Sequence, residues 1–320
     1  MTDTPPTQSK EICLFISHTF KRPDEDRLYG AIEAGGTKVN VAVGRSATDI
    51  VATDRIETGT PTATIEGILG FFEEYRVKIL SFGVASFGPV RLDRTASDWG
   101  RLIATPKLGW TGASFVQPLI DAYAIPVELE TDVSAAAIAE YQFGALRGSR
   151  CGIYLTVGTG IGGGIVIDGV PVRGNLHPEI GHIRISRGAA DTGFSGSCPY
   201  HGDCLEGLAS GPAIERRWGT SLDRLPEDHQ AHRIIADYLG QACATLALTM
   251  SADRIVIGGG VSKVAGLHRA IANRMRYWLG GYLDGPTIRN DTFIVAPDLS
   301  DRAGITGALL LAQRADLPDR

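Results

Sequence analysis

Two stretches far apart in the sequence share one pattern, in which an apolar strand runs into glycines and a second alternating strand follows. The first is YGAIEAGGTKVNVAVG at 29–44, and the second is GIYLTVGTGIGGGIVID at 152–168. Apolar alternation on both sides of a glycine turn predicts a β-hairpin. A repeated hairpin indicates a weak internal duplication. We therefore expect an α/β fold with two related domains that face each other across a cleft.

Other segments are expected to complete the two domains. Apolar runs predict further strands at 50–57, 80–90, 126–130, 254–261 and 292–296. Helical spacing or alanine-rich composition predicts helices at 64–76, 133–146, 231–250, 263–279 and 303–315. Residues 1–27 are rich in Thr and Pro and then charged, so we expect a flexible leader.

The composition is that of an ordinary globular protein and disfavours several functional classes. Of 320 residues, 43% are hydrophobic and 21% are charged, which is enough for two domains with their own cores. A net charge of -5 leaves no basic surplus to neutralise phosphates, so nucleic acid is not an expected partner. No run reaches the roughly 20 apolar residues of a membrane span. Five cysteines, an odd number, argue against a disulfide framework, and we expect a cytoplasmic enzyme.

One loop carries a metal-ligand pattern. Cys198, His201 and Cys204 form C-x2-H-x2-C, and His182 lies upstream of them. Two thiolates and two imidazoles suit tetrahedral Zn²⁺, and four protein ligands without an open position are typical of a structural site. His177 is a competing imidazole. The alternative is a disordered loop with chance cysteines.

Two carboxylates are interleaved with these metal-ligand candidates. Glu179 precedes His182, and Glu206 follows Cys204. A zinc site does not need either of them. A metal that orders a glycine-rich loop while orienting two carboxylates would form a rigid floor for a polyhydroxy ligand.

Glycine turns allow backbone N–H groups to approach an anion closely, because no Cβ stands in the way. The three candidate turns are Gly35-Gly36-Thr37-Lys38, Gly158-Thr159-Gly160 and Gly258-Gly259-Gly260. The first two lead into a strand rather than a helix, so neither a P-loop nor a dinucleotide fingerprint fits. Each turn alone is more often structural, but three of them suit a triphosphate held between two domains. Lys38 is either a phosphate partner or a solvated charge.

Asp132 ends a predicted strand and begins an alanine-rich helix in the stretch ETDVSAAA. Asp is a preferred helix N-cap, so a purely structural role is one interpretation. The other is a general base that takes the proton of a substrate hydroxyl as this attacks a phosphoryl group. The order of the motifs along the chain favours the second.

Taken together, the motifs resemble the ROK family of repressors, open reading frames and kinases, and within it the bacterial zinc-containing fructokinases. The matching pieces occur in family order over about 29–315, as IEAGGTK, ASFGPV, TPKLGW, ETDVSAAA, LTVGTGIGGG, HPEIGH, CPYHGDCLEGLASGPAI and IVIGGGV. HPEIGH and CPYHGDCLEG are the specific ones, since the glycine turns are common to actin-like ATPases.

The resemblance implies an actin- or hexokinase-like fold and phosphorylation of a hexose by Mg²⁺-ATP, with fructose giving fructose 6-phosphate. Asp132 would be the catalytic base, and Glu179, His182 and Glu206 would contact the sugar, with His182 also on zinc. The first two glycine turns would hold phosphates, and the third the adenosine. We expect one domain from 28–132 with 300–316, a second from 133–299 that carries the zinc loop, and a homodimer.

Two positions depart from the wider family, and other functions stay open. Glu33 stands where many members carry Asp near the phosphates and Mg²⁺, and Thr131 where many glucokinases have Asn. The second departure favours fructose over glucose. A glucokinase or mannokinase, a sugar-binding protein without catalysis and a sugar-sensing repressor are the alternatives. The repressor is disfavoured because it needs a winged helix-turn-helix ahead of the body.

Overall fold

The computed structural model describes residues 27–188, 191, 193–283 and 285–317. Apart from Arg27, the expected leader at 1–27 lies outside these residues. Arg27 pairs with Asp316, with 2.5 Å between Nη2 and Oδ2, and so joins the start of the first strand to the end of the last helix.

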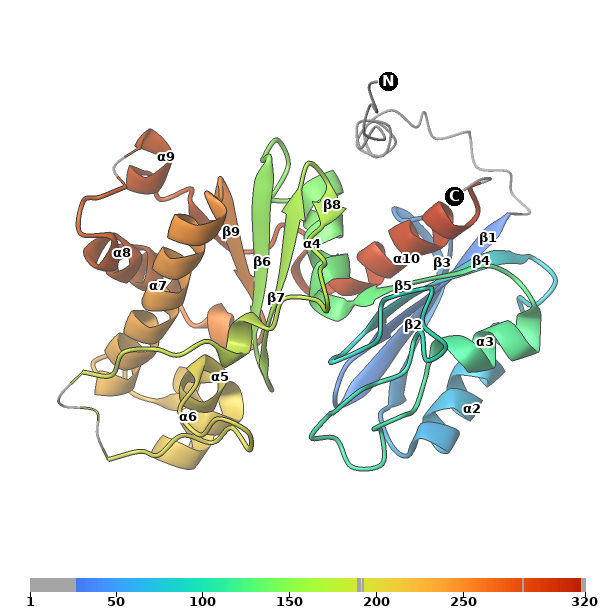
Figure 1. Cartoon of the computed structure of the whole chain (residues 1–320), viewed down its shortest axis with the longest axis horizontal. Helices are drawn as coiled ribbons and strands as arrows, with labels where there is room; N and C mark the ends of the chain where they lie inside the picture. Colours follow the sequence, from blue (N-terminus) through green and yellow to red (C-terminus); the bar gives the residue numbers. More distant parts are fainter. Residues whose placement is uncertain (1–26, 189–190, 192, 284, 318–320) are drawn as a thin grey trace, which may run out of the picture.

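Two five-stranded sheets form the centres of two lobes (Figure 1). The first sheet has the order β3-β2-β1-β4-β5 and contains β1 (Leu28–Ala34), β2 (Lys38–Ser46), β3 (Asp49–Glu57), β4 (Ile79–Ser86) and β5 (Val127–Thr131). The second has the order β10-β9-β6-β7-β8 and contains β6 (Cys151–Val157), β7 (Ile161–Ile167), β8 (Val170–Pro171), β9 (Arg254–Gly258) and β10 (Ile294–Val295).

The two sheets have the same topology, which confirms the predicted duplication. In the first, β1 pairs antiparallel with β2 and parallel with β4, and β4 pairs parallel with β5. In the second, β6 takes the place of β1, with β7 antiparallel and β9 parallel to it, and β10 parallel to β9. Both glycine-containing hairpins are therefore the central hairpins of their sheets.

Two helices pack between the sheets, and each packs on the sheet that it does not directly follow. Helix α4 (Asp132–Phe143) comes after β5 but packs on β6 and β7, whereas α10 (Ala303–Ala315) comes after β10 and packs on β1 and β4 (Figure 1). Small residues allow this close approach, since a Cβ at Gly307 would lie 2.1 Å from the carbonyl oxygen of Ala135. These contacts support our proposed division into 28–132 with 300–316 and 133–299.

The remaining helices cover the outer faces. On the first lobe these are α2 (Pro61–Glu73) and α3 (Val116–Tyr123), and on the second α5 (Leu205–Ala209), α6 (Gly211–Trp218), α7 (Gln230–Met250), α8 (Leu267–Leu279) and the short α9 (Pro286–Arg289). Neighbouring residues of β1 show the two faces. Ile32 packs with the α2 and α3 side chains, and Ala31 packs with those of α4 and α10, as strand alternation requires.

The predicted helix bounds shift where caps and glycines decide them. The helix predicted at 64–76 begins at Pro61, because the Thr60 side chain accepts a hydrogen bond from the Ala63 N–H. The helix predicted at 263–279 begins only at Leu267, after Gly266 with a φ of 75°. Helices α3, α5, α6 and α9 were not predicted. In the described part of the chain, no helix combines the length and apolar character that crossing a bilayer requires.

Candidate active site

Three carboxylates meet where the two lobes join. Glu33 lies near the end of β1, Asp132 begins α4, and Glu179 precedes the 3-10 turn η1 (Ile180–His182). Burial, together with the charges of Glu33 and Glu179, raises the pKa of Asp132 to about 7, against opposing backbone hydrogen bonds such as that from Val133. The sequence-predicted base thus lies within electrostatic reach of carboxylates from both lobes.

The interpretation of Asp132 as the helix N-cap is wrong. Thr131 is the N-cap residue of α4, and its Oγ1 accepts from the Ser134 N–H at 3.1 Å. Asp132 occupies the first helical position, where its Oδ1 accepts from the adjacent Val133 N–H at 2.9 Å. The second oxygen of this half-buried carboxylate is therefore not needed to satisfy the helix end.

Glu33 is held at the start of α10. Its Oε2 accepts from Asn40 Nδ2 at 2.8 Å, and burial raises its pKa. A Cβ at Gly304, in the first turn of α10, would lie 2.2 Å from Glu33 Oε1. Glycine at 304 is thus what lets the longer side chain of Glu33 fit.

Glu179 and Glu206, the two carboxylates of the metal loop, face each other. Burial and, to a smaller extent, the charge of Glu206 raise the pKa of Glu179 to about 7. Glu206 Oε2 accepts from the Ile161 N–H at 2.9 Å and would lie 2.7 Å from a Cβ at Gly160. Glu206, predicted as a sugar contact, therefore also fixes the second glycine turn.

The first glycine turn is tight and exposed at its tip. The Gly35 N–H donates to the Lys38 carbonyl oxygen at 2.9 Å, and Gly36, Thr37 and Lys38 are exposed. Lys107, from the TPKLGW motif, reaches the turn and donates from Nζ to the Gly36 carbonyl oxygen at 2.6 Å. The first turn thus has two nearby ammonium groups, of which the sequence predicted one.

The second and third turns lie next to each other. A Cβ at Gly158 would lie 3.9 Å from the Gly260 nitrogen, and one at Gly259 would lie 2.4 Å from the Val157 carbonyl oxygen. Gly259 has a φ of 89°, which L side chains rarely adopt. The Gly211 N–H, at the start of α6, donates to the Gly158 carbonyl oxygen at 2.8 Å. The exposed Thr159 lies at the tip of the second turn.

One carboxylate links the first turn to the third across the lobes. Lys263, which follows the third turn, donates from Nζ to both oxygens of Asp301 at 2.9 Å. The hydrogen bond from Lys263 lowers the pKa of Asp301, and the charge of Lys38 contributes. Lysines next to glycine turns of both lobes therefore interact with the same carboxylate, that of Asp301.

The four predicted metal ligands come together. One ligand atom each from His182, Cys198, His201 and Cys204 lies within 4.8 Å of all the others. Individual Sγ to Nδ1 distances are 3.8 Å for Cys198 to His182, 3.7 Å for Cys198 to His201, and 3.6 Å for Cys204 to His182. Bonds of about 2.3 Å to sulfur and 2.0 Å to nitrogen in a tetrahedron place such atoms about 3.6 Å apart. The donor set and its spacing fit Zn²⁺.

His177, the competing imidazole, is not in the cluster of four. Its Nε2 lies 3.2 Å from the Val90 nitrogen and its Nδ1 lies 3.4 Å from Glu179 Oε1. Sequence reasoning missed this contact and that of Lys107, although the motifs HPEIGH and TPKLGW contain both residues. Val90 and Gly36 lie in other segments, so spacing along the chain could not reveal them as partners.

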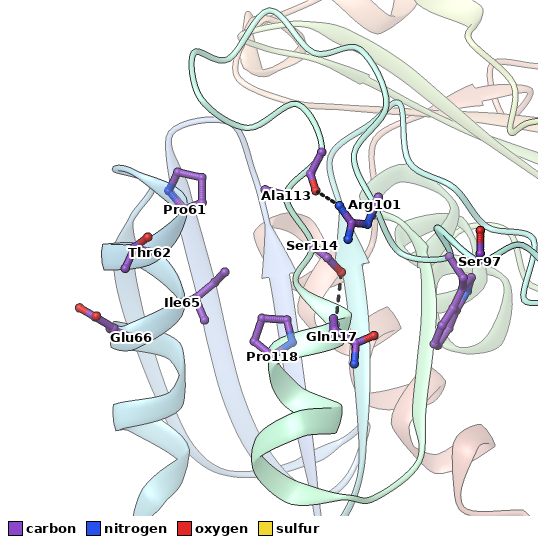
Figure 2. Close-up of a pocket in the computed structure, with 12 residues that line it drawn as sticks. Pro61, Thr62, Ile65, Glu66, Ser97, Arg101, Ala113, Ser114, Gln117 and Pro118 are labelled. Carbon is purple, nitrogen blue, oxygen red and sulfur yellow. Dashed lines mark hydrogen bonds between the residues drawn. The ribbon is translucent and has the colours of Figure 1, made fainter.

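A separate pocket lies on the first lobe, away from these residues. Its volume is about 450 Å³, and Figure 2 shows Pro61, Thr62 and Ile65 of α2 facing Ser114, Gln117 and Pro118 at the start of α3. Arg101 and Ser97 border the other side. None of the predicted site residues lines this pocket.

Comparisons with known proteins agree with this arrangement. A model of the ROK family matches residues 29–315. The chain is 42% identical over 299 residues to a fructokinase of Zymomonas mobilis, covering 92% of this chain and 99% of the relative. It is 37% identical to a fructokinase of Pediococcus pentosaceus, covering 90% of this chain and 98% of the relative. The solved ROK glucokinase of Streptomyces griseus, in complex with glucose and AMPPNP, superposes with a TM-score of 0.70 at 26% identity, over 90% of this chain and 99% of that one. This likeness confirms the predicted two-lobed kinase fold.

Proposed function

Because the chain belongs to the ROK family, we propose that it transfers the γ-phosphoryl group of ATP to a hexose, with fructose giving fructose 6-phosphate. The fructokinase names of relatives at 42% and 37% identity support the choice of fructose. The runner-up is a preference for glucose or mannose, and the glucokinase among the solved structures supports its glucose form.

The observation that carries this proposal is the position of Asp132. It lies at the junction of the lobes, is not the helix cap, and has a pKa of about 7, which suits a general base near neutral pH. The sugar hydroxyl oxygen forms a bond to the γ-phosphorus as the bond from that phosphorus to the ADP oxygen breaks. The hydroxyl proton passes to Asp132.

The sugar would rest on the metal loop. Glu179 and Glu206 are acceptors for pairs of hydroxyl groups. His182 directs Nδ1 at the cysteines, which leaves Nε2 to donate to a sugar hydroxyl. Buried hydrogen-bonding groups of this kind discriminate strongly among hexoses, because a sugar without the matching hydroxyl leaves them unpaired.

The nucleotide would be held by the three glycine turns. Gly35, Gly36, Thr37 and Lys38 from the first lobe and Gly158, Thr159 and Gly160 from the second are proposed for the phosphates, and Gly258, Gly259 and Gly260 for the adenosine. Mg²⁺ would neutralise the phosphate oxygens. Glu33 lies near the proposed phosphate turn, and a cation there would offset the burial that disfavours its ionised form and raises its pKa.

We also propose one structural Zn²⁺ on His182, Cys198, His201 and Cys204. The ion would connect η1 to the start of α5 and so fix Glu179 and Glu206 together. We also propose the cytoplasm as the location of the protein, and the described cysteines Cys151, Cys198, Cys204 and Cys243 are free thiols. A homodimer is proposed as well, with exposed Tyr277 and Tyr282 near the end of α8 as candidate contacts.

An ADP-release assay with fructose, glucose, mannose and N-acetylmannosamine tests the function. The expected order places fructose first in kcat/KM. A higher value for glucose or mannose would move the substrate assignment to the runner-up and leave the kinase assignment intact. ADP release that no hexose stimulates would reject both. Light scattering of the same preparation tests the dimer.

A further inference from the structure

We propose that His177 is a positioning residue that orients the Glu179 carboxylate toward the sugar, an inference that rests on the proposed function of Glu179. The imidazole lies between the two lobes. Its Nε2 faces the Val90 nitrogen of the first lobe at 3.2 Å, and its Nδ1 faces Glu179 Oε1 of the second lobe at 3.4 Å.

The ring is held in a closed site. The His177 side chain is 4% exposed, and a Cβ at Gly88 would lie 2.9 Å from its Cε1 and 3.2 Å from its Nε2. Only a residue without a side chain at 88 leaves room for the ring in this place. The same Cβ position lies 3.6 Å from Glu179 Oε1, so Gly88 also leaves room for the carboxylate.

The backbone contact decides the tautomer. A backbone N–H can only donate, so Nε2 must accept from Val90 and carries no hydrogen. The single proton of the neutral imidazole is then on Nδ1, which faces Glu179. Burial lowers the pKa of His177, against an opposing hydrogen bond with the Pro178 backbone, and so favours the neutral ring that this geometry requires. Val90 therefore turns His177 into a donor for Glu179.

This donor has a consequence for sugar binding. Glu179 also faces Glu206, and repulsion between the two carboxylates disfavours a fixed ionised Glu179. A hydrogen bond to Oε1 would favour the ionised form and leave Oε2 for the sugar. At 3.4 Å the contact is longer than an ideal N–H···O bond, and active-site contacts commonly shorten when substrate binds. Because Val90 belongs to the other lobe, the donor also depends on how the lobes are placed.

Two substitutions separate the two ends of the ring. In His177→Asn, the amide NH₂ takes the place of Nδ1, so the donor to Glu179 is kept and the Val90 N–H loses its acceptor. In His177→Gln, the longer side chain places its amide oxygen where Nε2 was, so the acceptor for Val90 is kept and the donor is lost. Both side chains are neutral and smaller than or similar to imidazole.

We expect His177→Gln to raise the KM for fructose about tenfold, the usual effect of losing a hydrogen bond to a charged group, with the KM for ATP unchanged. His177→Asn should raise the KM for fructose less than His177→Gln does. Its Tm should fall further than that of His177→Gln, because the Val90 N–H loses its acceptor. In a Glu179→Ala background, His177→Gln should cause no additional rise. The reverse order of the two variants, equal effects on both substrates, or additive effects with Glu179→Ala would each overturn the proposal.

The tautomer of His177 can be measured by NMR without any enzymatic turnover. In protein labelled with ¹⁵N-histidine, the His177 signals are identified by their loss in His177→Gln. The expected spectrum is that of an Nδ1–H tautomer from pH 6 to 8. An Nε2–H tautomer or a charged ring would overturn the proposal about His177, whatever the result of the kinase assay. The absence of hexose phosphorylation would instead reject the proposed function, and the two failures can therefore be told apart.

Discussion

Thr131 Oγ1 accepts a hydrogen bond from the Ser134 N–H at 3.1 Å, and this contact assigns two adjacent residues to two different tasks. Thr131 is the N-cap of α4 and satisfies the free N–H of Ser134, whereas Asp132 accepts from the Val133 N–H through Oδ1 alone and keeps Oδ2 for another partner. The strand and the helix meet at this point, so a capping residue and a proposed base occupy neighbouring positions at the lobe junction.

Substitutions at these two residues should therefore have opposite effects. Asp132→Asn keeps the shape of the side chain but removes its basicity, and we expect kcat to fall about 100-fold or more without loss of stability. Thr131→Ala removes the cap and should lower the free energy of unfolding by about 1 kcal/mol. Steady-state kinetics and urea unfolding of both variants check this. An Asp132→Asn enzyme with near-full activity would rule out the general base.

The pKa values predict an acid limb in the activity profile. Asp132 and Glu179 each have a pKa near 7, and the proposed base and the proposed sugar contact both act in the ionised form. The value of kcat/KM for fructose should fall as pH drops below 7, by about tenfold per unit for one group and about 100-fold if both must ionise. A pH series at fixed ionic strength checks the slope, and a flat profile down to pH 5 would contradict the prediction.

The raised pKa of Asp132 affects stability in the opposite direction from activity, because ionisation of the buried carboxyl lowers the free energy of unfolding. A carboxyl whose pKa is higher in the folded state contributes most below its unfolded pKa of about 4, and loses that contribution as pH rises to the folded value near 7. Asp132→Asn removes this titration. Its stability relative to the wild type should grow between about pH 4 and 7 and stay constant above. Urea unfolding at pH 5 and pH 8 measures the difference.

Metal removal should abolish activity, because the metal loop carries the proposed sugar contacts Glu179 and Glu206. The loop gains order from its ligands, so chelation should lower Tm and stop sugar phosphorylation, and Zn²⁺ but not additional Mg²⁺ should restore both. Elemental analysis should find one zinc per chain. Cys198→Ser combined with Cys204→Ser should lose the metal. Cys151→Ser is a matched control, because Cys151 is as buried as Cys198, each 7% exposed, but lies outside the cluster. Full activity of the double variant would refute a zinc requirement.

A glycine pair tests the position of Glu33. In Gly304→Ala the new methyl group would meet Glu33 Oε1 at 2.2 Å, so the carboxylate must move, and we expect a lower kcat/KM for Mg²⁺-ATP. Gly70→Ala in α2 meets nothing within 4 Å and should stabilise the protein by roughly 0.4–1 kcal/mol. Equal kinetics of the two variants would show that the position of Glu33 does not matter for the nucleotide.

Much of the fold was determined by short-range patterns in the sequence. The hairpins around Gly35 and Gly158 follow from strand alternation and glycine, whose freedom at a turn is a local property. The spacing of Cys198, His201 and Cys204 likewise brings three candidate metal ligands together within one loop. Helix ends were less well predicted, because caps such as Thr60 and Thr131 depend on the backbone angles of a single residue.

The tertiary structure alone decided which distant groups meet. Val90 and His177 are 87 positions apart, and Gly36 and Lys107 are 71 apart, so no periodicity relates them. The packing of α10 on the first sheet and of α4 on the second likewise depends on small residues that interlock across the lobes. Contacts of this kind depend on how the two sheets stack, and stacking is set by the sum of many weak packing interactions. For that reason the sequence identified the carboxylates, whereas only the fold revealed which groups hold them in place.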